Sequence, residues 1–242
     1  MRRSLPIGLL VLTISSAGLA ATTAKDSAPK PKRGGPPAGS TGFQMALRTG
    51  AQLPVGDATG EPGDSLSRRY AWQWPVAIDL GAKLMPELFV GAYFGFGVGS
   101  TGSDTRLEAD CDDDDENFEN EISCNAASLK LGLEAHYFFS PSARMTPWIG
   151  YGIGYESASA WISDTENGYD ETVRANGFTY AEISFGLDLR YRIGFGPYAS
   201  AAIGGFTRTT TEIGGKKVYE GPIDDQALHA WINLGFRFVV NP

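Results

Sequence analysis

The sequence predicts an all-β fold: an eight-stranded antiparallel up-and-down β-barrel that spans a membrane, with short periplasmic turns and long outer loops. Three observations lead to this prediction. The C-terminal segment alternates between apolar and polar or small side chains, seven earlier segments alternate similarly, and the connections between the segments alternate in length. Alternation with a period of two separates the side chains on the two faces of a strand. A membrane barrel needs this separation because lipid lies outside and a polar interior lies inside.

The N-terminal region predicts export. Residues 1–24 have the pattern of a signal peptide, because two arginines precede an apolar run that is too short for a stable membrane span. Small residues offer cleavage sites after Ala20 or Ala24. Residues 25–41 predict a disordered basic tail rich in proline, since no apolar periodicity offsets the entropy of ordering. Residues 42–242 are long enough for one domain, and this domain is the predicted barrel.

Length and alternation support each of the eight predicted strands. A tilted membrane strand needs about 9 to 11 residues, whereas strands of soluble sheets average roughly 5 to 6. All eight segments reach or slightly exceed the longer figure, and only the seventh is poorly patterned. Pro75 in the second segment predicts a bulge or a late start. In order, the segments are 43–53, 72–83, 88–99, 128–138, 148–157, 179–192, 197–206 and 228–239.

The connections between these strands favour a barrel over a soluble β-sandwich. Short turns are expected after the second, fourth and sixth strands, and long polar loops after the first, third, fifth and seventh. Outer-membrane barrels place short turns in the periplasm and longer loops outside. A sandwich gives no reason to sort its loops in this way.

The last strand adds a resemblance to a known family. Asn233, Gly235, Phe236 and Phe238 resemble the C-terminal signal by which bacterial outer-membrane barrels are recognised for assembly. With the strand and loop pattern, the chain resembles the small OmpA-like and OmpX-like eight-stranded barrels. The resemblance implies location in the bacterial outer membrane, contact with outer-membrane lipid and lipopolysaccharide, and assembly by the barrel-assembly machinery.

Charged side chains of both signs fall on the predicted inward faces. An eight-stranded barrel is only wide enough for its own side chains, so unpaired charges there are costly. We therefore expect a structural salt-bridge network, and a gated ion path is the functional alternative. The expected members are Arg48, Lys83, Lys130, Arg190 and Arg237 with Asp79, Glu134, Glu156, Glu182 and Asp188.

The predicted second outer loop is strongly acidic and is bracketed by Cys111 and Cys124. Two cysteines this close in an exported protein predict a disulfide, which would stabilise the fold by about 3 kcal/mol in the chain-entropy model. The acidic residues suggest weak calcium or magnesium binding, although a solvated acidic surface is the alternative. The candidate ligands occupy positions 1, 3, 5 and 12 of a calcium loop, but the sixth position lacks the usual glycine. They are Asp110, Asp112, Asp114 and Glu121.

The sequence favours a role carried by the outer loops. We expect no enzyme, no catalytic residue and no tightly bound cofactor, because the two histidines are expected at opposite ends of the barrel. The net charge of −8 argues against nucleic acid as a partner. The predicted function is a closed outer-membrane barrel with a structural or surface-interaction role towards an unknown extracellular partner. A narrow ion or solute channel and a lipid-modifying enzyme are the alternatives.

Overall fold

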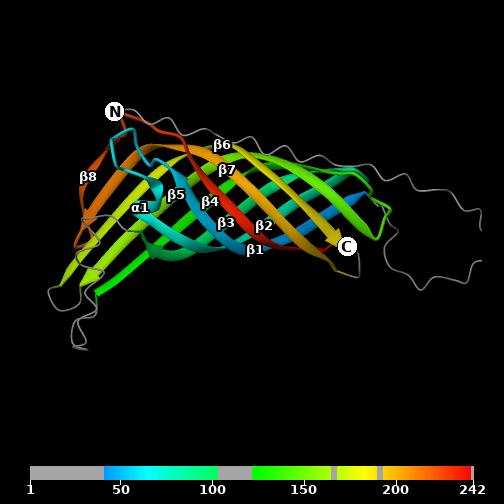
Figure 1. The fold of residues 1–242 in the computed structure, drawn as a ribbon, viewed down its shortest axis with the longest axis horizontal. Helices are drawn as coiled ribbons and strands as arrows, with labels where there is room; N and C mark the ends of the chain where they lie inside the picture. Colours follow the sequence, from blue (N-terminus) through cyan, green and yellow to red (C-terminus); the bar gives the residue numbers. More distant parts are fainter. Residues whose placement is uncertain (1–40, 103–121, 165–167, 190–192, 241–242) are drawn as a thin grey trace, which may run out of the picture. The chain divides into compact units, whose positions relative to one another are not determined.

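Eight strands close into a barrel in the computed structural model, which describes residues 41–102, 122–164, 168–189 and 193–240 (Figure 1). Neighbouring strands pair antiparallel in the order β6-β5-β4-β3-β2-β1-β9-β7, and a further pairing of β6 with β7 closes the ring. The predicted eight-stranded up-and-down barrel is confirmed. The wall consists of β1 (Gly42–Gly56), β2 (Tyr70–Met85), β3 (Leu88–Thr101), β4 (Ile122–Phe138), β5 (Met145–Asp164), β6 (Tyr169–Leu189), β7 (Gly194–Ile213) and β9 (His229–Val240).

β4, β5, β6 and β7 extend at their outer ends well beyond the predicted bounds, and the extension of the last three changes two connections. β5 and β6 stay paired as far as Asp164 and Tyr169, so the expected long loop between them is mostly a hairpin. β7 continues to Ile213 and pairs with an additional strand, β8 (Lys216–Pro222). Gly214 and Gly215 join these two strands with φ of +56° and +71°, a conformation that suits glycine in a tight hairpin turn. Both predicted long loops are thus corrected to strand extensions beyond the apolar part of the wall.

The first long connection contains the short helix α1 (Leu66–Arg69). Leu66 is completely buried, and the segment before it is fixed by a backbone hydrogen bond from Ala58 to Asp64. Asp64 also pairs with Arg69 at 2.6 Å. This connection therefore folds back against the end of the barrel. No helix within the described residues has the length and apolarity to cross a membrane.

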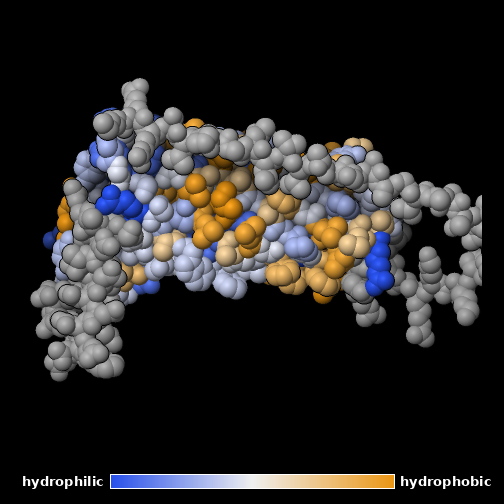
Figure 2. Space-filling model, in the orientation of Figure 1, coloured by the Kyte–Doolittle hydropathy of each residue, from blue (hydrophilic) through white to orange (hydrophobic). Residues whose placement is uncertain are grey.

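Outward side chains form an apolar belt around the barrel. Leu133, Phe185 and Leu234 are 64%, 60% and 56% exposed, whereas inward residues of the same strands are buried. Figure 2 shows hydrophobic residues gathered over the middle of the face in view. Monomeric soluble proteins rarely expose apolar patches of this extent. The belt ends where outward positions become polar, at Ser100, Asn125, Ser157, Asn176 and Arg208.

The predicted irregularity near Pro75 lies a few residues earlier. The β2–β3 register shifts between Tyr70 and Gln73, which marks a bulge at the start of β2. Pro75 itself keeps its place opposite Gly97, and its carbonyl accepts a hydrogen bond of 3.0 Å from the Thr49 hydroxyl. Pro75 has no N–H to donate to the sheet, but its carbonyl has a hydrogen-bond partner.

Candidate functional site

Arg48 on β1 lies at the centre of the barrel interior. Its guanidinium contacts Asp79 at 2.8 Å, Glu182 at 2.9 Å and Glu134 at 3.2 Å, and these residues come from β2, β6 and β4. Arg48 is 3% exposed and Asp79 is completely buried. Guanidinium presents five N–H donors in a fixed plane, so a single side chain can serve several carboxylates. Arg48 thus connects opposite sides of the wall.

A second cluster surrounds Arg237 on β9, nearer the end of the barrel that carries the short turns. Arg237 pairs with Asp188 at 2.8 Å and approaches Asp79 at 3.7 Å. The indole N–H of Trp148 donates to the other oxygen of Asp188 at 3.1 Å, and the Arg237 guanidinium lies 4.8 Å from the Trp148 ring centre. His136 stacks on Trp148 with 4.8 Å between ring centroids. Charge and aromatic surface are therefore packed together in this cluster.

A third cluster lies towards the outer end. Glu156 on β5 is hydrogen-bonded to His229 at 2.6 Å and accepts a hydrogen bond from the Thr179 hydroxyl. The His229 ring also packs on Phe206, with 4.3 Å between centroids. The Lys130 ammonium lies 5.2 Å from the centre of the Trp231 ring. Both histidines of the chain are almost fully buried, which places neither at an open surface.

Buried apolar side chains pack with the second and third clusters and continue towards the two ends of the barrel. On the outer side, buried Leu66, Tyr70, Phe206, Ile223 and Trp231 belong to one cluster, and Leu66 enters it from α1. On the other side, a smaller cluster unites Phe89, Phe138, Trp148 and Tyr198. Dehydrated apolar layers oppose the passage of ions. We call the charged clusters and these two layers together the filled interior.

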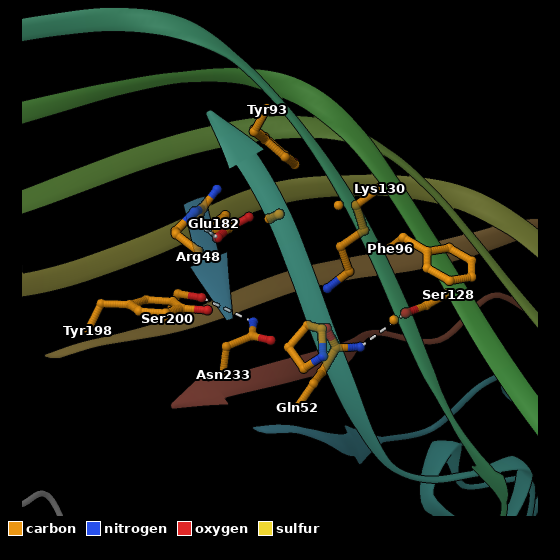
Figure 3. A pocket seen from close by; sticks show the side chains of 14 residues that line it. Arg48, Gln52, Tyr93, Phe96, Ser128, Lys130, Glu182, Tyr198, Ser200 and Asn233 are labelled. Carbon is orange, nitrogen blue, oxygen red and sulfur yellow. Dashed lines mark hydrogen bonds and ion pairs between the residues drawn. The ribbon is translucent and has the colours of Figure 1, made fainter. Parts of the chain in front are cut away.

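A small cavity remains within the filled interior (Figure 3). It offers about 40 Å³ to the centres of water molecules, and one water needs roughly 10 to 15 Å³ by that measure, so about three waters fit. Arg48, Lys130, Glu182 and Asn233 line it, together with the Tyr93 hydroxyl, which has no hydrogen-bond partner among the described residues. The space suits a few ordered waters.

The structure brings most of the predicted interior charges together. The Lys83 ammonium lies 4.0 Å from the centre of the Phe138 ring, which the Arg237 guanidinium also approaches, at 6.0 Å. Arg190 lies outside the described residues, so its predicted place in the network stays a prediction. The residues found in the three clusters are Arg48, Asp79, Lys130, Glu134, Glu156, Glu182, Asp188 and Arg237.

The predicted acidic site lies outside the described part of the chain. Asp110, Asp112, Asp114 and Glu121 fall within residues 103–121, as does Cys111, whereas Cys124 lies near the start of β4. The cation site and the disulfide therefore both stay predictions. Within residues 41–102, 122–164, 168–189 and 193–240, no group of three or more His, Cys, Asp or Glu side chains could hold a metal ion.

Sequence reasoning missed the hydrogen bonds among the uncharged interior side chains. Gln52 donates to Gln73 and Ser128 at 3.2 and 3.3 Å, and the Ser128 hydroxyl donates to Gln73 at 2.6 Å. Tyr93 lies along the inner wall so closely that a Cβ on Gly132 or Gly154 would meet its ring or hydroxyl at 2.5 Å. This packing agrees with the sequence, because inward glycines predict room for large side chains from facing strands.

Gly95 provides a test of this packing. A Cβ added there would lie 3.5 Å from Ala77, at ordinary contact distance and beside the cavity, whereas a Cβ on Gly91 would lie 2.5 Å from the Leu80 carbonyl oxygen. We expect Gly95→Ala to raise the free energy of unfolding by about 0.4 to 1 kcal/mol, because it reduces the entropy of the unfolded chain. Gly91→Ala should lower it. Denaturant titrations of both variants check this, and equal effects would contradict the packing described.

The comparisons with known proteins add resemblance in fold. No family model and no curated protein matches the chain. Among solved structures, Neisserial surface protein A has 10% identity and a TM-score of 0.47, with 84% of this chain and 99% of that chain covered. A major outer membrane protein from Thermus thermophilus has 13% identity and a TM-score of 0.47, covering 83% and 99%. Ail, the attachment invasion locus protein of Yersinia pestis, has 10% identity and a TM-score of 0.43, covering 82% and 98%. At these identities the likeness concerns the fold alone.

Proposed function

We propose that this chain is a closed barrel of the bacterial outer membrane, with a structural or surface-interaction role carried by its outer end. The filled interior is the observation that carries the proposal. Arg48 contacts three carboxylates from other strands, and buried apolar side chains pack with the other two charged clusters towards both ends of the barrel. The apolar belt supports placement in a bilayer, since its outward residues would otherwise face water.

The outer end offers the surface for such a role. β5, β6 and β7 continue beyond the belt and, with β8, present a paired sheet whose outward side chains are mainly hydroxyl, amide and charged groups. Its inner face buries Ala158, Ala160 and Ala175, which belong to the apolar cluster at this end of the barrel. The partner of this surface is extracellular in the proposed orientation, with the short turns in the periplasm.

Membrane placement has a direct test. Folded outer-membrane barrels resist detergent, so the full chain in outer-membrane fractions should migrate differently on a gel before and after heating. A chain that partitions into the periplasmic or soluble fraction, with no change on heating, would refute the placement.

Conductance separates the closed barrel from the channel alternative. We expect refolded wild-type protein in planar bilayers to give no stepwise current, because the cavity in the filled interior has space for only a few waters. Insertion should be verified in the same sample by heat-modifiable migration. Reproducible current steps from inserted protein would favour the narrow channel, and turnover of phospholipid or lipid A by the same sample would favour the enzyme.

A further inference from the structure

Aromatic side chains mark the outer edge of the apolar belt on β5 and β6. Tyr155, Phe178 and Tyr180 are 40%, 52% and 47% exposed, and the rings of Tyr155 and Phe178 meet edge to face with 6.1 Å between centroids. The Tyr155 hydroxyl donates to the Asn176 side chain at 2.9 Å. Aromatic girdles of membrane barrels lie where the hydrocarbon core meets the head groups. This edge is therefore the expected level of the outer-leaflet head groups.

Two arginines stand immediately beyond this edge on the same outward face. Arg208 pairs with Asn176 in the first outward row beyond the aromatic side chains. Arg174 pairs with Thr210 in the second outward row. On β5, Ser159 lies opposite Arg174 in the register. The Arg174 Nε–H donates a hydrogen bond to the Ser159 hydroxyl at 3.2 Å. Among the described residues Arg174 forms no ion pair, and Arg208 pairs only with Glu220.

Charges of both signs occupy this face. Glu220 bridges Arg208 at 3.1 Å and Lys217 at 2.6 Å, and the pKa of Glu220 is lowered by its hydrogen bond with Lys217. Two further carboxylates are Glu212, paired in register with Thr172 and Lys217, and Asp170, which accepts a hydrogen bond from the Ser163 hydroxyl at 2.6 Å. Three cations therefore share this face with three carboxylates, and Arg174 is the one of these cations that pairs with no carboxylate among the described residues.

We propose that Arg174 and Arg208 bind the phosphate of a lipid in the outer leaflet. Guanidinium groups bind phosphate through paired charge-assisted hydrogen bonds, and Arg174 keeps most of its donors free of protein acceptors in the described structure. The Arg208–Glu220 pair is solvent-exposed and therefore weak, so a phosphate can compete for Arg208. This inference rests on the proposed membrane placement.

The test measures lipid retained by the inserted full chain. Wild-type protein is refolded into phosphatidylcholine bilayers that contain a small fraction of diphosphoryl lipid A, extracted in mild detergent, and analysed for lipid A bound per folded barrel. We expect the Arg174→Gln/Arg208→Gln double variant to retain at least tenfold less, because the loss of even one charge-assisted hydrogen bond to phosphate weakens binding about tenfold. The Arg174→Lys/Arg208→Lys variant should retain an intermediate amount, since lysine keeps the charge without the planar fork.

Arg144→Gln is the matched control, because Arg144 is an exposed arginine in the turn at the opposite end of the barrel. It should retain as much lipid A as wild type. Equal retention by the double variant and wild type would overturn the site, and an equal loss in Arg144→Gln would reduce the effect to general charge attraction. Heat-modifiable migration is recorded for every sample. Failure of the wild type to insert would refute the membrane placement, whereas insertion with unchanged retention would refute the lipid site alone.

Discussion

Arg48→Ala should produce the largest loss of stability of any single change in the interior, about 3 to 5 kcal/mol in the free energy of unfolding. The substitution leaves Asp79, Glu134 and Glu182 facing one another without the cation that contacts all three. A second cation near Asp79 is Arg237, 3.7 Å away and already paired with Asp188. A buried carboxylate without a partner is strongly unfavourable. Removing the cation from a buried group of charges therefore lowers the free energy of unfolding.

Unfolding of refolded barrels in guanidinium chloride, followed by tryptophan fluorescence, measures the effect. It should appear as a shift of the unfolding midpoint with an unchanged slope. Arg48→Lys is the first control, because it keeps the charge but loses the geometry that reaches three carboxylates, so an intermediate loss is expected. Arg208→Ala is the second, since its pair with Glu220 is solvent-exposed, and its midpoint should stay close to that of wild type. A wild-type midpoint for Arg48→Ala would mean that the interior is hydrated well beyond the small cavity.

The fold followed from the sequence because period two is a local property. The alternation within each strand shows which residues face outward and which face inward. In β1, for example, Met45 and Leu47 alternate with Gln44 and Arg48. Eight strands with this pattern predict a closed barrel. The interior position of Arg48 could be predicted for the same reason. The sequence also placed Asp79, Glu134 and Glu182 in the interior, but not their contacts with Arg48, because these depend on the register between strands and join residues 31, 86 and 134 positions apart.

The outer extensions escaped prediction for a different reason. Residues 207–213 of β7 are mainly threonine and charged residues, so they show no apolar face from which a strand could be recognised. Their strand structure comes from backbone pairing with β6 and β8. Burial of Leu66 likewise depends on tertiary packing, since α1 has only four residues and no side-chain cap at its start.

Leu131→Arg should lower the free energy of unfolding in a bilayer by about 2 to 4 kcal/mol, because arginine on the lipid face is unfavourable near the midplane. Leu131 points outward from β4 and is 52% exposed, near the middle of a run of outward positions that extends from Phe139 to Ala127. Reversible unfolding of the barrel from lipid vesicles measures this change. Gly132→Ala, on the inward face, cannot serve as a mild control, because a Cβ there would collide with the Ile153 carbonyl oxygen.

Asn125→Arg is the appropriate depth control for Leu131→Arg. Asn125 shares the outward face of β4 with Leu131 but lies beyond the apolar belt, where its side chain donates to the Ser123 hydroxyl at 2.6 Å. The cost of arginine falls to about 0 to 1 kcal/mol near the interface, so this variant should unfold nearly as wild type does. The difference between the two variants reports depth in the bilayer rather than the chemistry of arginine. Equal costs at both positions would show that β4 does not cross hydrocarbon between Asn125 and Leu131, and the proposed membrane placement would then fail.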